Sequence, residues 1–441
     1  MLRSILLGPN YLLKKRTIER TEFFAKKELA QLQSQELHRI LSRAVNAIPF
    51  YQAFFSQRDV TIFENLAQVL PRFPIIDKRT IRNNFDIFYA GSSVRRLKAT
   101  SGGSTGQPFV FYMDRFITRQ VEKAFIFDQW SRAGYQLGDP IFNLRGRTPA
   151  KGRFVYHDRL FNIHYASSFN LTAQTIGDYI EAINRLQPRF LHGYPSTMYQ
   201  MATLMEAAGK SLDFQPTAVF CGSEKLFPYQ REKIESIFGS RVYHWYGHSE
   251  CLALGGACEY SDKLHFYPQY GYTELVPSGV HDERGRELFE IVATGFNNPV
   301  MPLIRYRTGD YAVPSANQTC RCGRHYLLID EVIGRQQEFI VDTYGSLISA
   351  TSLVFGQHYD AFGTTESIKL HQKRPGQLDV ILVKGAGFSE HAFREMQTRM
   401  QELIGDRVTI RFLFSDQVKK TAIGKARLVE QELDIRKYLG K

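Results

Sequence analysis

Several apolar segments of the chain end abruptly in a short polar turn, and this pattern constrains the fold more than any other feature. The segments precede the turns Gly193-Tyr194-Pro195-Ser196, Gly222-Ser223-Glu224 and Gly247-His248-Ser249-Glu250. Amphipathic helices are predicted between them, over residues 178–186, 197–208 and the stretch from Pro228 to Gly239. Alternating strands, turns and helices are typical of an α/β domain, where ligands bind at the carboxyl ends of the strands.

The N-terminal part of the chain is predicted to be largely helical. Residues 18–48 carry apolar side chains at helical spacing up to Pro49, and residues 115–133 form a second long helix ended by Gly134. Asp77 can cap a short helix that runs through Ile81. This opening part is expected to be a scaffold rather than a source of reactive groups.

The last hundred residues change character and indicate a small α+β unit. Residues 378–383 alternate as a strand, Ser389 caps a helix that ends at Gly405, and residues 408–414 form another strand. We therefore expect an α/β protein with a large N-terminal domain of mixed sheets and helices, over residues 1–335. A small, mobile α+β C-terminal domain is expected over residues 336–441.

The stretch richest in glycine and hydroxyl groups runs from Lys98 to Pro108. Its central residues are Thr100, Ser101, Gly102, Gly103, Ser104, Thr105 and Gly106. Glycines let a backbone turn with its amides inward, and hydroxyls add donors, so the stretch can cradle a polyphosphate. It is not a Walker loop, because no Gly-Lys-Ser/Thr ends it and an alternating run follows. A surface loop or hairpin turn is the competing interpretation, and this stretch alone does not separate the two.

Composition and charge fit a globular protein that handles anions. The chain has 441 residues, is 43% hydrophobic and carries a formal net charge of +12. Such a charge suits a nucleotide, coenzyme phosphates, nucleic acid or peripheral contact with an anionic membrane face, although a solvated surface explains any single cluster. No apolar run is long enough to span a bilayer, and the first residues are too short an apolar stretch for a secretory signal. We expect a cytoplasmic protein, and the sequence does not indicate its oligomeric state.

The cysteines suggest a metal site rather than disulfides. Their number, five, is odd, and the chain is long, which argues against a disulfide framework. Cys258 with His265, and Cys320 with Cys322, supply two pairs of ligands that fit a tetrahedral zinc site. Buried core cysteines are the competing explanation. Because the second pair lies in a loop rich in Gly, Arg and Asn, we favour a structural zinc ion that ties this loop to the main domain.

Further residues could carry chemistry, although each also has an ordinary structural explanation. Glu250 could hold Mg²⁺ on phosphates, and Asp310, in the predicted turn 305–310, could accept from two ribose hydroxyls. Lys425, in the glycine-bearing stretch 420–425, could neutralise a developing phosphoryl charge. Acidic residues at strand ends are often caps, and a lysine near a chain end is usually just solvated.

Together, these motifs resemble in order and wording the adenylate-forming enzymes, the superfamily of acyl-CoA synthetases, luciferases and peptide-synthetase adenylation domains. The matching stretches are Ser101–Pro108 for the phosphate loop, Gly222–Glu224 for the adenine-side turn, Tyr246–Glu250 for the magnesium motif, Arg307–Asp310 for the ribose motif, Gly334-Arg335 for the hinge and Thr421–Lys425 for the catalytic lysine loop. They span residues 98–427.

Within that superfamily the chain is similar to the phenylacetate–CoA ligase-like branch, which includes relatives linked to capsular polysaccharide synthesis. The similarity rests on the chain length and on Pro49-Phe50-Tyr51, Pro302-Leu303-Ile304-Arg305-Tyr306 and Cys320-Arg321-Cys322-Gly323-Arg324. The chain departs from the pattern at Gly103, where many members have Thr, and at Gln337, where Asp or Lys is usual. It shows no second glycine-rich signature specific for CoA.

The resemblance implies two half-reactions. A carboxylate attacks the α-phosphorus of ATP to give an acyl-adenylate and pyrophosphate, and then a thiol, expected to be CoA, displaces AMP. An amine on a sugar or glycan precursor is the alternative acceptor. The implied roles are Lys425 bridging carboxylate and α-phosphate, Thr100–Gly106 holding pyrophosphate, Glu250 holding Mg²⁺, Asp310 binding ribose and Arg335 contacting ribose or closing the domains.

The turns around the assigned α-phosphate position predict the character of the acid. The side chains that we expect to line its pocket are Tyr194, Phe220, Tyr246 and His248. No Arg or Lys stands in these turns, which favours an aromatic or medium-sized apolar acid over a dicarboxylate or an amino acid. The rival from another class, a basic zinc-containing nucleic-acid-binding protein, lacks a compact Cys/His module and an RNA-binding aromatic motif, so no nucleic acid is expected.

Overall fold

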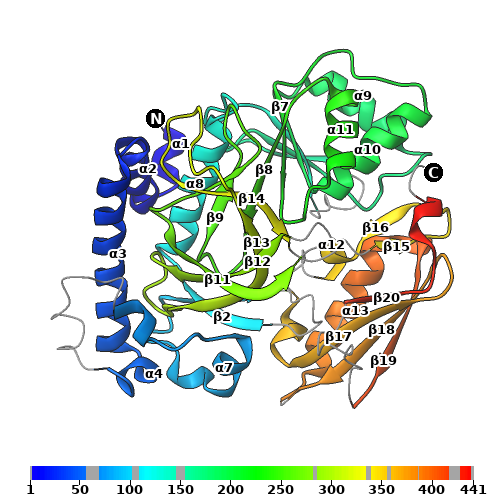
Figure 1. The fold of residues 1–441 in the computed structure, drawn as a ribbon. Helices are drawn as coiled ribbons and strands as arrows, with labels where there is room; N and C mark the ends of the chain where they lie inside the picture. Colours follow the sequence, from blue (N-terminus) through cyan, green and yellow to red (C-terminus); the bar gives the residue numbers. More distant parts are fainter. Residues whose placement is uncertain are drawn as a thin grey trace. The chain divides into compact units, whose positions relative to one another are not determined.

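The computed structural model describes residues 2–55, 69–101, 109–145, 154–281, 286–333, 339–354, 359–385, 387–416 and 428–438. The chain forms two compact units, and each is assembled from separate stretches (Figure 1). Unit 1 comprises Met1–Ala99, Phe111–Leu137 and Tyr243–Gly334, and unit 2 comprises Thr100–Val110, Gly138–Val242 and Arg335–Lys441.

The described helices of unit 1 come mostly from its N-terminal stretch. They are α1 (Leu2–Leu6), α2 (Pro9–Thr21), α3 (Lys26–Ala47), α4 (Pro49–Gln52), η1 (Leu70–Arg72), α7 (Lys78–Asn83), η2 (Phe85–Ile87) and α8 (Thr118–Ser131). The single helix predicted over residues 18–48 is wrong at its start. The Glu28 carboxylate accepts a hydrogen bond from the Ala25 amide at 2.8 Å, which caps a new helix after α2 has ended.

Unit 1 also contains a run of antiparallel strands. Its strands, in spatial order, are β11 (Gly271–His281), β12 (Glu287–Gly295), β13 (Tyr306–Pro314), β14 (Leu327–Ile333), β10 (Leu264–Phe266), β9 (Leu254–Gly256) and β8 (Val242–Gly247). The turn predicted around Asp310 is wrong, because Asp310 lies inside β13. There the register against β12 shifts between Glu290 and Val292, and Gly309 has φ +82°, so the segment is a bulge rather than a chain reversal.

Unit 2 contains a mainly parallel sheet that is covered by helices. Strands β7 (Ala218–Gly222), β6 (Phe190–Gly193), β3 (Ile141–Leu144) and β5 (Ile163–Ala166) are parallel neighbours, and β4 (Val155–Asp158) runs antiparallel to β5. The accompanying helices are α9 (Ile176–Leu186), α10 (Pro195–Ala207) and α11 (Pro228–Phe238). The predicted α/β rhythm of residues 178–246 is therefore confirmed.

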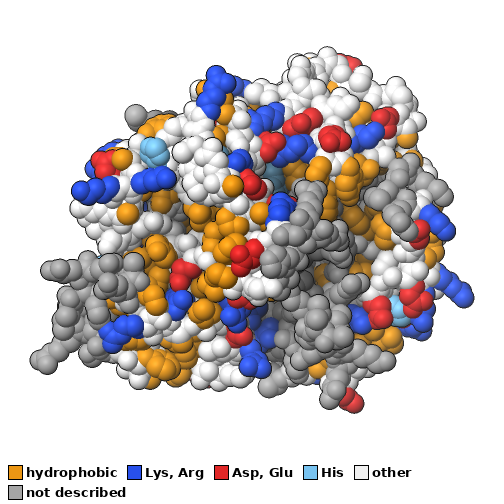
Figure 2. Space-filling view, viewed as in Figure 1, with side chains coloured by type: hydrophobic (Ala, Val, Ile, Leu, Met, Phe, Trp, Pro, Cys, Tyr) orange, Lys and Arg blue, Asp and Glu red, His pale blue; other side chains and the backbone are white. Residues whose placement is uncertain are grey.

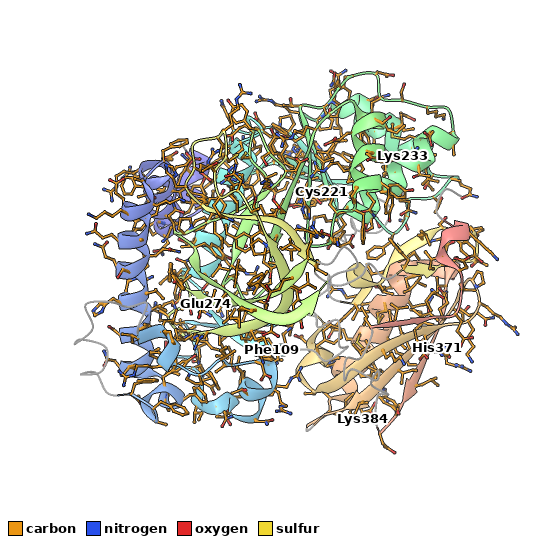
Figure 3. The ribbon with its side chains drawn as sticks, in the orientation of Figure 1. Phe109, Cys221, Lys233, Glu274, His371 and Lys384 are labelled. Atoms are coloured by element: carbon orange, nitrogen blue, oxygen red, sulfur yellow. The ribbon has the colours of Figure 1, made fainter. Side chains whose placement is uncertain are left out.

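One face of this sheet packs against its helices. Phe142, Leu191, Val219 and Cys221 share a buried core with helix residues such as Met201, and Figure 3 labels Cys221 on β7. Because side chains alternate along a strand, the residues between these positions lie on the opposite face.

The C-terminal stretch of unit 2 is the small α+β region that the sequence predicts. Its described elements are β15 (Phe339–Val341), β16 (Leu347–Ser349), α12 (Ala350–Val354), η3 (Asp360–Gly363), β17 (Thr365–Gln372), β18 (Gln377–Lys384), α13 (Glu390–Ile404), η4 (Gly405–Arg407), β19 (Thr409–Phe414), β20 (Val429–Gln431) and η5 (Ile435–Tyr438). The strand order β19-β18-β17-β20 forms a mixed sheet. Ser389 caps α13 as predicted, accepting from the Ala392 amide at 3.2 Å. The fold class is confirmed, whereas the boundary between residues 335 and 336 stays a prediction.

Strands β1 (Arg96–Ser101) and β2 (Phe109–Asp114) flank the glycine-rich stretch, whose residues 102–108 lie outside the described part of the chain. Burial along β2 alternates at its start, as its sequence predicts. Lys and Arg side chains are interspersed with Asp and Glu on the face drawn in Figure 2. Among the described residues, none of the helices combines the length and apolar character needed to cross a membrane.

Candidate active site and metal cluster

In unit 2, the polar residues predicted from the turns gather at one edge of the parallel sheet. Leu144 pairs with Gly193, and Gly193 pairs with Cys221, so the carboxyl ends of β3, β6 and β7 are adjacent. Ser223 lies just beyond β7 in the left-handed region, with φ +69°, a conformation that a non-glycine residue adopts only when its surroundings hold it. The edge therefore presents a strained, well-supported turn.

Contacts from neighbouring strands fix this turn. The Glu224 carboxylate accepts from the Ser196 amide at the start of α10 at 3.2 Å, and the Ser223 hydroxyl accepts from Arg145 Nη2 at 2.6 Å. The Arg145 guanidinium also stacks 4.7 Å from the Tyr194 ring centroid. Sequence reasoning missed Arg145, because its neighbours in space are set by the order of the strands.

Phe220 and Gly222 precede Ser223 within β7. Phe220 is fully buried, and its ring stacks on Phe190 with centroids 5.0 Å apart. Gly222 ends the strand and leads into Ser223. The assignment of Phe220 to the substrate pocket stays a prediction.

In unit 1, Glu250 is a buried carboxylate surrounded by donors. Its side chain is 5% exposed, and Oε1 accepts from the Tyr306 hydroxyl at 3.0 Å. Lys78 Nζ lies 3.5 Å from Oε1, and His248 Nδ1 lies 3.6 Å from Oε2. A buried carboxylate needs positive charge beside it, which Lys78 supplies here, and carboxylate oxygens are the ligands that Mg²⁺ prefers.

Lys78 was not predicted to belong to a site, and a remote segment delivers it. Ile76 forms a parallel bridge with Tyr306, and the Arg307 amide donates to the Ile76 carbonyl at 2.8 Å. Asp77 then caps α7, accepting from the Thr80 amide at 2.7 Å as the sequence predicts. The first turn of α7 is thereby anchored beside Glu250.

The predicted magnesium and ribose motifs meet in unit 1. The Tyr246 hydroxyl donates to Asp310 Oδ2 at 2.9 Å, and burial, followed by the nearby Asp310 charge, raises the pKa of Tyr246 well above its ordinary value. Tyr246 therefore stays a neutral donor. A Cβ on Gly247 would lie 2.9 Å from Leu254 Cδ1, so a side chain would be crowded there. Ser249 is exposed beside Glu250.

The structure describes only two of the remaining predicted site residues, Thr100 and Ser101. Thr100 and Ser101 end β1, where Ser101 is buried. Gly102, Gly103, Ser104, Thr105, Gly106, Arg335 and Lys425 lie outside the described residues, so their roles stay predictions.

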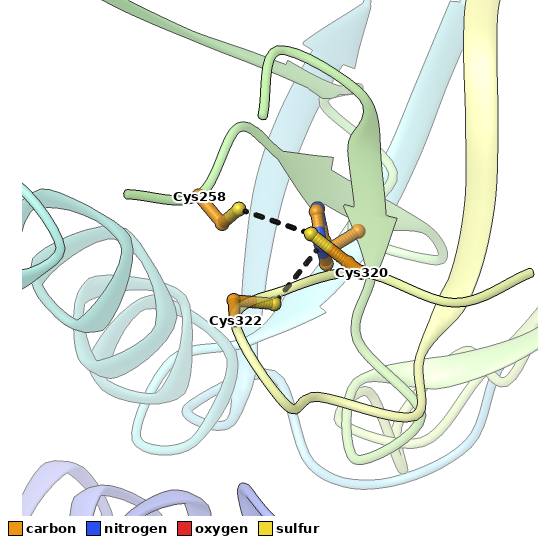
Figure 4. Close-up of side chains that lie close together, drawn as sticks. Cys258, Cys320 and Cys322 are labelled. Atoms are coloured by element: carbon orange, nitrogen blue, oxygen red, sulfur yellow. Dashed lines mark hydrogen bonds between the residues drawn. The ribbon is translucent and has the colours of Figure 1, made fainter. Parts of the chain in front are cut away.

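The four predicted metal ligands come together in unit 1, and Figure 4 labels the three cysteines among them. The ligand atoms of Cys258, His265, Cys320 and Cys322 all lie within 4.8 Å of one another. Cys258 Sγ is 3.6 Å from Cys320 Sγ, and Cys322 Sγ is 3.3 Å from His265 Nε2. Tetrahedral zinc with ~2.3 Å bonds to sulfur places its ligand atoms about 3.8 Å apart, so the donor set and spacing fit zinc.

Backbone geometry orients each pair of ligands. His265, fully buried on β10, points Nδ1 at the Lys263 carbonyl at 2.9 Å, which directs Nε2 toward the cysteines. The Gly323 amide donates to the Cys320 carbonyl at 3.1 Å with φ +80°, which closes a tight turn around Cys322. A hydrogen bond between Cys258 and Cys322 lowers the pKa of the Cys322 thiol and raises the pKa of the Cys258 thiol.

Ion pairs next to the cluster tie it to the N-terminal helices. Arg324, two residues after Cys322, bonds Glu259 at 2.7 and 2.8 Å and Glu22 at 2.7 Å. Glu259 follows Cys258 directly, and Glu22 follows α2. The loop that carries Cys320 and Cys322 is thus joined to both other segments.

The architecture occurs in solved structures. The chain has a TM-score of 0.54 to a 2-hydroxyisobutyryl-CoA ligase solved in an open conformation with 2-HIB-AMP and CoA, at 17% identity and with 93% of each chain covered. The same enzyme in its thioesterification state gives a TM-score of 0.55, covering 96% of this chain and 93% of that one. This similarity shows that the chain shares the fold of that ligase.

Proteins of similar sequence indicate which class of ligase the chain resembles. The chain is 22% identical to protein CapK of Staphylococcus aureus over 409 residues, covering 91% of this chain and 88% of CapK. It is 24% identical to phenylacetate–coenzyme A ligase of Thermus thermophilus over 416 residues, covering 88% and 87%. No protein-family model matches the chain. The chain is therefore similar over most of its length to phenylacetate–coenzyme A ligase and to CapK, and this similarity fits the phenylacetate–CoA ligase-like branch of the adenylate-forming superfamily.

Proposed function

We propose that this chain is an AMP-forming ligase that activates a carboxylic acid with ATP as an acyl-adenylate and then transfers the acyl group to a thiol, CoA. One observation carries the proposal: Tyr246 and Glu250, from one motif, are held beside Asp310 and Lys78 from two distant segments. Relatives that span most of the chain are phenylacetate–coenzyme A ligases, which supports the same chemistry.

In this proposal the chain's own residues position and neutralise rather than react covalently. Glu250 holds Mg²⁺, which offsets phosphate charge when bound, and Lys78 and Tyr306 orient the Glu250 carboxylate. Asp310, oriented by Tyr246, accepts from the ribose hydroxyls. Thr100–Gly106 hold the departing pyrophosphate, and Lys425 approaches the α-phosphate as the C-terminal domain, residues 336–441, turns about Gly334 to Gln337.

Exchange of labelled pyrophosphate into ATP tests the first half-reaction. We expect exchange that depends on an added carboxylic acid, followed by AMP release and a CoA thioester when CoA is present. Replacing CoA with an amine such as glucosamine tests the alternative acceptor. We expect no acylated amine in that reaction. A folded protein that shows no exchange with any acid of a broad panel would contradict the proposal.

We also propose that Cys258, His265, Cys320 and Cys322 bind one structural zinc ion. Three thiols and one imidazole form a closed donor set, which leaves no position for a reacting group, so the ion contributes folding energy rather than chemistry. Metal analysis of the purified protein should give about one zinc per chain. Absence of any stoichiometric metal from protein prepared without chelator would contradict this site.

A further inference from the structure

Arg145 stands at the edge of the parallel sheet that carries Tyr194, one of the residues predicted to line the acid pocket. It follows β3 directly, on the face opposite to the helix-packed residues Phe142 and Leu144. The same face carries Tyr194 after β6, and Ser223 follows β7. The guanidinium therefore reaches across the carboxyl ends of three neighbouring strands.

Contacts from all three strands hold the arginine in place. Its Nη2 donates to the Ser223 hydroxyl at 2.6 Å, and its guanidinium stacks on Tyr194 at 4.7 Å. The Arg145 amide donates to Asn143 Oδ1 at 3.0 Å, and Asn143 Nδ2 lies 2.9 Å from His192 Nδ1. A side chain ordered in this way loses little conformational entropy when it binds a ligand, so the site is pre-organised.

Arg145 itself supplies the positive charge that an anion would bind at this edge. His192 is buried, and burial, followed by the Arg145 charge, holds its pKa well below the usual value, so the imidazole is neutral. A guanidinium has five N–H donors in a planar fork, so the bond to Ser223 is compatible with a second, bidentate partner. The Tyr194 ring covers one face of the guanidinium, so such a partner would bind at the edge, where the N–H groups point.

We propose that Arg145 determines substrate specificity by binding a second carboxylate on the acid, so that the preferred substrates are dicarboxylic. This inference rests on the proposed ligase function, and it revises the apolar acid predicted from the turns alone. Arg145 does not touch the reacting carboxylate in this proposal. It positions the far end of the substrate against Tyr194 and the Ser223 turn.

Matched acids that differ only in the second carboxylate provide the test. Hexanoate is compared with adipate, and phenylacetate with 4-carboxyphenylacetate, in acid-dependent ATP–pyrophosphate exchange. With the wild type we expect a KM for each diacid about 10- to 100-fold below that for its monoacid, which is the range of one charge-assisted, bidentate contact. Arg145→Leu should abolish this preference and leave the KM for ATP within about twofold. Arg145→Lys should keep part of it, because charge remains without the fork.

Arg189→Leu is the control. Arg189 stacks on Phe190 at 5.2 Å and pairs with Asp139 at 2.9 Å. It therefore makes contacts similar to those of Arg145, but at the amino ends of the strands, away from the proposed anion site. Its loss should leave the diacid preference unchanged. A wild type that prefers the monoacids, or an Arg145→Leu variant that raises the KM for ATP while keeping the preference, would overturn the proposal. The latter result would assign Arg145 to the nucleotide.

Direct binding separates failure of this inference from failure of the ligase function. Adipate and hexanoate are titrated into folded wild type and Arg145→Leu, and the shift of the melting temperature is followed. If no acid supports exchange but adipate alone stabilises the wild type, and does so only when Arg145 is present, the ligase proposal fails and the anion site stands. If adipate stabilises both proteins equally or neither, the anion site fails.

Discussion

The metal cluster of unit 1 and the strand-end edge of unit 2 are both built from residues far apart in the sequence, but they are held differently. Cys258 and His265 are fully buried, and backbone hydrogen bonds orient the ligands. Arg145 and Ser223 lie just beyond the ends of their strands, are less buried, and are oriented mainly by each other's side chains. Burial in the metal cluster therefore favours stability, whereas the strand-end edge keeps its polar groups within reach of a ligand.

The difference predicts which changes affect catalysis and which affect folding. Substitutions among the strand-end groups and around Glu250 should change kinetic constants with little effect on melting. Substitutions in the cluster should do the opposite. The variants below test this division, from the largest expected effect to the smallest.

Glu250→Gln should have the largest kinetic effect. The amide is similar in shape but lacks the charge that holds Mg²⁺, so pyrophosphate exchange should fall by roughly 10²- to 10³-fold, the cost typical of losing one group that neutralises transition-state charge. Exchange is measured over a range of Mg²⁺ concentrations, with Glu290→Gln, whose carboxylate pairs with Arg307 at 2.9 Å, as the control. Activity near the wild-type value at limiting Mg²⁺ would contradict the assignment.

Cys320→Ser combined with Cys322→Ser should have the largest effect on stability. Loss of two ligands should release about one zinc per chain and lower the free energy of unfolding by more than about 3 kcal/mol, because binding of a structural metal is part of the folding energy. Metal content and chemical denaturation measure both effects. Cys221→Ser, which changes a buried cysteine outside the cluster, controls for loss of a thiol. Unchanged metal content would refute the site.

Tyr246→Phe should produce a smaller kinetic effect. It removes the 2.9 Å hydrogen bond to Asp310, which should raise the KM for ATP by about 2- to 10-fold, the range for one net hydrogen bond. The KM for the acid is measured in parallel and should stay constant. A change confined to the acid would instead place Tyr246 in the acyl pocket.

Asp77→Ala should have the smallest effect. Loss of the α7 cap should lower the free energy of unfolding by about 1 kcal/mol, and it should also reduce exchange, since Lys78 follows Asp77 directly. Asp77→Asn keeps an acceptor and should restore most of both. Loss of stability without any loss of exchange would contradict the proposal that Lys78 orients the Glu250 carboxylate.

Local patterns predicted most of the fold and some of the site. The strand ends before Ser223 and Glu250, and the caps at Asp77 and Ser389, follow from periodicity and short-range hydrogen bonding. The metal cluster was predictable because its ligands come as two local pairs. The break before α3 was missed because a single Glu28–Ala25 bond, rather than Gly or Pro, marks it.

The remaining errors involve contacts that depend on tertiary structure. Arg145 meets Ser223 only because β3, β6 and β7 are neighbours in that order, and Lys78 meets Glu250 only through the bridge between Ile76 and Tyr306. The Arg-Thr-Gly-Asp stretch was predicted as a turn, because glycine commonly marks turns, but it forms a bulge inside β13. One-dimensional patterns do not specify such pairings.

The most direct test of the central claim compares wild type with Lys425→Ala in acid-dependent ATP–pyrophosphate exchange, with melting temperatures measured on the same samples. The chain should catalyse exchange only when acid is present, and the variant should lose it by roughly 10²- to 10³-fold while melting as the wild type does. Exchange by the variant at the wild-type rate, or none by the wild type with any acid, would contradict an adenylate-forming ligase in which Lys425 acts on the α-phosphate.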